Sequence, residues 1–146
     1  MGADSFNHAN IGAWDTSNVT DMSFMFVNAS SFDQSLSSWV TSSVTDMSGM
    51  FVDASSFDQS LSSWNVSLVT SMENMLDDAA LSTANYDATL YGWVYRPVQI
   101  GVKLGARGIS VTPSPSAGSR SRELLTTAPK NWIISDGSGS GCGDCP

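Results

Sequence analysis

Trp14 to Ser38 reads WDTSNVTDMSFMFVNASSFDQSLSS, and Trp39 to Ser63 reads WVTSSVTDMSGMFVDASSFDQSLSS, so the chain repeats itself. The two 25-residue blocks agree at 21 positions. A looser third copy begins at Trp64, and a partial copy over residues 6–13 precedes the first. A fixed period of about 20 to 50 residues predicts stacked repeats, because one such unit is too small to bury its own apolar face.

Two apolar patterns follow one another within each repeat. Residues 61–66 alternate, which predicts a short strand with Trp64 and Val66 facing inward. Residues 47–54 place their apolar side chains on one helical face, and Asp46 falls in the first turn, where a carboxylate meets the positive end of the helix dipole. The patterns predict an α/β fold, a right-handed leucine-rich-repeat-like solenoid with parallel short strands, short helices and a C-terminal cap.

The period ends near residue 80, and this divides the chain into three parts. The predicted parts are solenoid repeats over 1–80 (partial 6–13, then 14–38, 39–63 and 64–80), a capping segment over 81–136 and a Gly/Ser/Cys exit linker over 137–146. Within the cap, the sequence predicts a helix from residue 81 to Leu90 with Gly92 as a break, one or two strands within 102–111, and a helix over 120–127. A terminal segment of this kind covers the core that the last repeat would expose.

Charge is distributed unevenly along the 146 residues, whose net charge is -8. Residues 1–95 contain 11 acidic residues and no Lys or Arg, whereas all six basic residues lie in 96–146. Nucleic-acid binding is excluded for the repeats, because affinity for phosphates depends on Lys and Arg. No apolar run is long enough to span a bilayer. The first residues lack the features of a signal peptide, so we expect a mature or trimmed piece of a longer chain.

The motif Trp-x-x-Ser-x-Val-Thr-x-Met-x-x-Met-Phe, with Phe-Asp-Gln-Ser-Leu-Ser-Ser-Trp between copies, resembles the BspA-like leucine-rich repeats of bacterial surface proteins. These repeats are also described as the DUF285 family, first noted in mycoplasma lipoproteins. The resemblance covers residues 6–80, and the tail is similar at 85–87, 92–93 and 132–137. It implies an extracellular repeat protein, at the cell surface, with adhesion or partner binding as its role and no catalytic residues. Family members often carry Asn after the repeat Phe, but here Asp33 and Asp58 replace it.

Candidate chemistry in the chain is sparse. His8 is the only histidine and no nucleophile motif surrounds it, so we expect no enzyme activity. The repeat stacks aspartates one above another, which leaves calcium as a possible cofactor, although helix-start and solvated turn roles are favoured. Cys142 and Cys145 form a lone CxxC, for which a local disulfide is expected in an exported protein and an intermolecular one stays open.

The predicted partner-binding surface is the outward side of the expected strands. Parallel strands make a broad and rigid platform, and its small polar side chains suit a protein or a glycan. The residues are Asp15, Ser17, Ser38, Val40, Ser42, Ser63, Asn65 and Ser67. The alternative is a structural subunit that self-assembles end to end into a filament or surface layer, because nearly identical repeats make an end resemble an interior seam.

Overall fold

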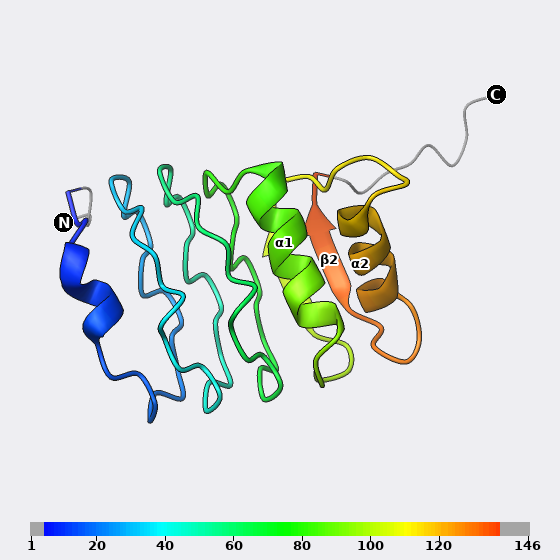
Figure 1. Cartoon of the computed structure of the whole chain (residues 1–146), viewed down its shortest axis with the longest axis horizontal. Helices are drawn as coiled ribbons and strands as arrows, with labels where there is room; N and C mark the ends of the chain where they lie inside the picture. The colour runs from blue at the N-terminus through cyan, green and yellow to red at the C-terminus, as the bar shows by residue number, and fades with distance from the viewer. Residues whose placement is uncertain (1–4, 138–146) are drawn as a thin grey trace.

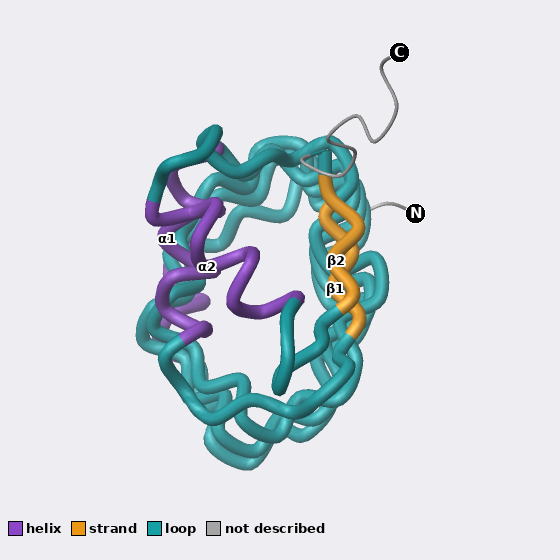
Figure 2. The backbone as a smooth tube through the Cα atoms, turned by 90° about the vertical axis from the view of Figure 1, so that its right-hand side faces the viewer, coloured by secondary structure: helices purple, strands orange, loops and turns teal. Residues whose placement is uncertain are grey.

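The computed structural model describes residues 5–137. In chain order the elements are a 3-10 helix η1 (Ala9–Ala13), helix α1 (Thr83–Val94), strand β1 (Lys103–Ala106), helix α2 (Ala117–Thr126) and strand β2 (Ile133–Asp136). Between η1 and α1 the repeats form loops that lie side by side along the long axis of the molecule (Figure 1). Strands β1 and β2 pair in parallel, with Lys103 opposite Ile133. Seen along the stack, α1 and α2 lie on one side and the two strands on the other (Figure 2).

The prediction of an α/β leucine-rich-repeat-like solenoid is wrong. The two described α-helices and the two-stranded sheet all follow residue 80, and the repeats over residues 14–80 contain neither an α-helix nor a strand longer than an isolated bridge. Residues 61–66 and 47–54 run as turns and irregular chain. A helix needs φ near −60° at every residue, but φ is +61° at Gly49 and +56° at Asp53. These left-handed residues prevent the predicted helix.

Backbone hydrogen bonds nevertheless connect successive repeats at one segment of each, which we call the ladder segments: residues 20–28, 45–53 and 70–78. Met22 N donates to Asp46 O at 2.9 Å, and Met47 N in turn donates to Ser71 O at 3.0 Å. Strand β1 continues the series, because Met72 N donates to Lys103 O at 3.1 Å. The segment whose spacing resembled a helix therefore carries the sheet-like hydrogen bonds between repeats.

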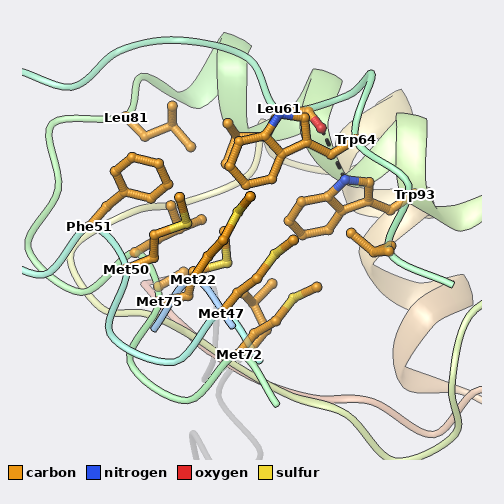
Figure 3. Packing of buried hydrophobic residues seen from close by; sticks show 14 of the residues in the cluster. Met22, Met47, Met50, Phe51, Leu61, Trp64, Met72, Met75, Leu81 and Trp93 are labelled. Atoms are coloured by element: carbon orange, nitrogen blue, oxygen red, sulfur yellow. Dashed lines mark hydrogen bonds between the residues drawn. The ribbon is translucent and has the colours of Figure 1, made fainter. Parts of the chain in front are cut away.

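Tryptophans from successive layers stack in the core. Trp39 and Trp64 lie with their rings 6.4 Å apart and nearly parallel, and both are buried, as the inward assignment predicts. The indole Nε1 of Trp64 donates to Leu36 O at 3.0 Å. That of Trp93 on α1 donates to Leu61 O, also at 3.0 Å (Figure 3). Each ring therefore satisfies its only polar group on the layer before it. Trp14 departs from the prediction, since it is 49% exposed at the end of the stack.

The helices of the C-terminal part extend beyond their predicted limits. Gly92 does not break α1, which runs to Val94. A Cβ at Gly92 would lie 2.3 Å from Ser62 O, so glycine is needed here for close approach of the helix to the second repeat. Helix α2 is confirmed but begins at Ala117, where Ser116 forms a capping box with Ser119. A single strand, β1, forms within the predicted range 102–111.

A buried ion pair joins the end of the chain to both helices. The side chain of Asp136 on β2 is fully buried and accepts hydrogen bonds from Arg122 Nε and from the Tyr86 hydroxyl, each at 2.9 Å. Burial, and then the Asp136 carboxylate, raise the pKa of Tyr86 well above its usual value, so its hydroxyl stays protonated as the donor. The three side chains hold α1, α2 and β2 together.

Candidate binding groove

The predicted partner-binding residues occur in register across the repeats, but not on strands. Ser38 and Ser63 lie in equivalent turns, and the turn at 62–63 packs against α1. Helix α1 lies across the molecule from β1 and β2 (Figure 2), so this series of turns is not part of the ladder. Val40 is 47% exposed, as expected for an outward position. Binding through these residues stays a prediction.

Several polar groups of that set are engaged within the protein. Ser38 Oγ donates to Gly12 O at 2.6 Å, and Ser63 Oγ donates to Ser37 O at 3.3 Å. Asp15 Oδ1 accepts hydrogen bonds from the N and Oγ of Ser17, and these bonds lower the pKa of its carboxyl. These side chains therefore connect or shape the repeats, which leaves fewer of their polar groups for a ligand.

A different surface gathers charged and polar groups on the outward side of the ladder, where the third repeat meets β1 and β2. Two hollows flank the Asp77 carboxylate and together form what we call the Asp77 groove. The first, of about 210 Å³, is lined by Glu73, Asn74, Asp77, Lys103, Leu104, Gly105, Ile133 and Ser135. The second, of about 500 Å³, is lined by Asp77, Arg107, Gly108, Ile134, Ser135, Asp136 and Gly137.

Asp77 is held rigidly at the centre of the groove. Its side chain is 11% exposed, and its Oδ1 accepts a hydrogen bond from Arg107 N at 2.9 Å. Gly105 allows β1 to approach, because a Cβ there would lie 2.3 Å from Asn74 N. The neighbouring Asp78 pairs with Arg107 at 2.6 Å. The groove therefore has a buried carboxylate whose position is fixed by backbone contacts.

The rim of the groove carries both signs of charge. Lys103 Nζ and Glu73 Oε1 form an ion pair at 3.0 Å, and both side chains are more than half exposed. Ile133 is 56% exposed beside them and supplies an apolar surface. This arrangement offers hydrogen-bond donors, acceptors and an apolar contact to one ligand, which suits polar groups such as sugar hydroxyls or peptide amides.

Sequence reasoning missed this groove because its residues come from parts of the chain about 30 and 60 positions apart. One signal was present in the repeat itself. Asp77 occupies the position of Val27 and Val52, so a carboxylate replaces an apolar side chain only in the repeat that meets β1. The basic partner Arg107 lies in the segment where the period has already failed, and no spacing rule connects the two.

His8 and the stacked aspartates, the other residues considered for chemistry, accept hydrogen bonds from nearby backbone N–H groups. His8 is exposed, and its Nδ1 accepts a hydrogen bond from Asn10 N as the cap of η1. The stacked carboxylates accept hydrogen bonds from protein: Asp21 from Ser23 N and Asp46 from Ser48 N. Within residues 5–137 no three His, Cys, Asp or Glu side chains are grouped as metal ligands. Cys142 and Cys145, with most of the predicted exit linker, lie outside the described residues.

The family model described as "Mycoplasma protein of unknown function, DUF285" matches residues 1–100. The chain belongs to the DUF285 family. This confirms the family that the repeat motif predicts. No curated protein and no solved structure matches the chain.

In this DUF285 protein Asp33 and Asp58, which follow the repeat Phe, make the same kind of hydrogen bond between layers as Asn7, the neutral residue at that position in the partial first repeat. Asn7 Oδ1 accepts a hydrogen bond from Asp33 N at 3.2 Å, and Asp33 Oδ1 accepts one from Asp58 N at 3.0 Å. Asp58 Oδ1 continues the series by accepting from Ser82 N at 2.7 Å. These carboxylates therefore connect layers, which corrects the expectation that they are only solvated turn residues.

We expect Asp58→Asn to reduce the loss of stability in acid. Burial raises the pKa of Asp58, but hydrogen bonds from Asn85 and Ser82 outweigh it and lower the net pKa below 3.8. Asp58 therefore contributes stability that is present above about pH 4 and lost as pH falls through its folded pKa. An Asn side chain has no carboxylate to protonate. Urea unfolding between about pH 5 and pH 2 should give a shallower decline for the variant, and an equal decline would contradict this linkage.

No helix of residues 5–137 is long and apolar enough to cross a bilayer.

Proposed function

We propose that this DUF285 protein is a non-enzymatic module that binds a protein or glycan at a cell surface, and that the ligand sits in the Asp77 groove. The observation that carries the proposal is the pre-organised set of polar groups there. Asp77 is fixed by Arg107 N at 2.9 Å, and Lys103 and Glu73 stand beside it on the rim. Groups already held in place lose little conformational freedom when a ligand binds.

The ladder supports this surface because its backbone hydrogen bonds fix the spacing of the outward side chains. Leu76 N donates to Gly105 O at 2.9 Å, and Asp78 N donates to Arg107 O at 3.0 Å. Strand β1 is in turn paired with β2 in parallel. The groove is therefore built across three hydrogen-bonded layers, whereas the predicted residues Ser38 and Ser63 lie in turns.

A matched pair of variants tests the site. Ser135→Arg places a long side chain in the groove, and Ser63→Arg makes the same change on the predicted outward row; both serines are exposed. The wild-type protein is screened against arrayed glycans and immobilised extracellular matrix proteins, and the variants are measured on the ligand found. We expect Ser135→Arg to lose binding and Ser63→Arg to retain it.

The opposite result would overturn the groove assignment. If Ser63→Arg loses binding while Ser135→Arg retains it, the ligand sits on the row of turns. If the folded wild-type protein binds nothing on either screen, the binding module itself is contradicted. Circular dichroism and thermal unfolding of both variants show that a loss of binding is not a loss of fold.

The second candidate, a structural subunit that self-assembles end to end, is supported by exposed apolar groups at one end of the stack. Trp14 is 49% exposed and Met25 is 40% exposed there. Light scattering over a range of protein concentrations tests this candidate, with calcium and with a chelator. Growth of mass with concentration would favour assembly over the binding module.

A further inference from the structure

One oxygen of the Asp77 carboxylate accepts no hydrogen bond from the described part of the chain. The residue is only 8% exposed, and its Oδ1 accepts from Arg107 N at 2.9 Å. Arg107 Nη2 lies 3.9 Å from Asp77 Oδ2, beyond hydrogen-bond distance, while it pairs with Asp78 Oδ2 at 2.6 Å. Within residues 5–137 every fully enclosed side-chain nitrogen or oxygen has a hydrogen-bond partner, so Asp77 Oδ2 reaches the space of the groove. The groove therefore contains a free acceptor on a buried residue.

Negative charge exceeds positive charge around this oxygen. The hydrogen bond to Asp78 raises the pKa of Arg107, and the charges of three carboxylates, those of Asp78, Asp77 and Asp53, raise it further. One guanidinium therefore faces three acids. The other cation of the groove is already paired on the rim, and residues 1–95 contain no Lys or Arg that could supply a further one. A ligand that brings a positive charge is favoured here.

The surroundings of the free oxygen match a lysine side chain. Ile133 is 56% exposed and lines the first hollow, so an apolar stem can pack on it. Ser135 lines both hollows, and its hydroxyl, which makes no hydrogen bond within residues 5–137, can accept one from an ammonium group. Because Asp77 Oδ1 is already engaged, only one carboxylate oxygen is free. A single oxygen suits the compact ammonium of lysine better than the planar guanidinium of arginine, which pairs with both oxygens of a carboxylate.

We infer that the Asp77 groove binds a lysine side chain of a partner protein, whose ammonium donates a hydrogen bond to Asp77 Oδ2. The inference rests on the proposed function and narrows its ligand from a protein or glycan to a protein. The turn itself does not need a carboxylate at this position. Val27 and Val52 occupy it in the earlier repeats, and their N–H groups donate to the carbonyl three residues back, as that of Asp77 does.

The experiment titrates the isotope-labelled full chain with a short peptide and follows the amide signals by NMR. The peptide is blocked at both ends and has one lysine among glycines and serines; a second peptide has the same lysine acetylated, which removes its charge. We expect the lysine peptide to shift the amide signals of Gly105, Arg107 and Ser135. The acetylated peptide should bind about tenfold or more weakly, because a hydrogen bond between charged groups is lost. Tighter binding of a matching arginine peptide would contradict the choice of lysine.

Asp77→Asn keeps an acceptor for Arg107 N but puts an amide donor in place of the free oxygen, so it should weaken binding of the lysine peptide about tenfold or more. Asp21→Asn is the matched control. Asp21 also accepts a backbone N–H, from Ser23 at 2.8 Å, and its substitution removes the same charge from the first ladder segment. We expect this variant to bind within about twofold of the wild type, because distant exposed charges are screened by salt. Circular dichroism of both variants checks that they are folded.

Three results would each overturn the inference: equal weakening by the two variants, equal binding of the lysine and acetylated peptides, or no binding of the lysine peptide at millimolar concentration. The proposed function fails or stands separately. If the ligand found by the screens is lost with Ser135→Arg but retained with Asp77→Asn, the groove is the binding site and the lysine assignment is wrong. If Ser135→Arg retains that ligand, the groove assignment itself is wrong.

Discussion

Trp64→Ala is expected to lower the free energy of unfolding by about 3–5 kcal/mol, the usual cost of deleting a buried aromatic side chain. Trp64 is fully buried, packs against the rings of Trp39 and Phe51, and donates its Nε1–H to Leu36 O at 3.0 Å. Its loss would leave a cavity in the stack and remove one of the two hydrogen bonds that Leu36 O accepts, the other coming from Trp39 N at 3.1 Å. Urea unfolding followed by circular dichroism measures the change.

Trp14→Ala is the matched control, because Trp14 has the same position in its repeat and the same residue type. It is 49% exposed, although its ring still stacks 6.3 Å from that of Trp39. We expect a clearly smaller loss than for Trp64→Ala, since exposed substitutions leave no cavity. Equal losses for the two variants would show that burial does not distinguish the layers in solution.

Asp136→Ala is expected to destabilise the protein by about 3 kcal/mol or more, because it removes one member of a buried ion pair and leaves the other uncompensated. Arg122 would lose the carboxylate that it holds at 2.9 Å, and the Tyr86 hydroxyl would lose its acceptor. The variant should unfold at lower urea concentration, with α1, α2 and β2 no longer held together. Hydrogen exchange should locate the loss in these three elements.

Glu73→Ala removes the acid of a different ion pair and serves as the control. Lys103 and Glu73 are 60% and 53% exposed, so their pairing at 3.0 Å is screened by water. We expect a change of about 0–1 kcal/mol. A larger effect than that of Asp136→Ala would contradict the assignment of Asp136 as the connection between the C-terminal elements.

The sequence predicted the family and most of the core. Trp39, Trp64 and Val66 are buried as their spacing indicates. It did not predict the local backbone. The spacing of residues 47–54 suits a helix, but Gly49 and Asp53 adopt positive φ, and spacing alone cannot distinguish a helix from a turn-rich segment.

The candidate site was largely beyond sequence reasoning. The predicted row from Asp15 to Ser67 was derived by assigning strands to the Trp-containing segment, and the sheet-like hydrogen bonds run through the other segment. The Asp77 groove depends on β1 and β2, which fall after the period has failed and meet the third repeat only in the folded chain.

The repeat by itself determined which side chains stack, because a side chain and its copy 25 residues later have the same neighbours and the same need for burial. Only the tertiary structure decided how the ends differ. The last repeat is covered by β1, α1 and the Asp136 ion pair, whereas the first repeat leaves Met25 and Trp14 exposed. Identical sequences have different burial here because a layer is buried by its neighbours, and an end layer has a neighbour on one side only.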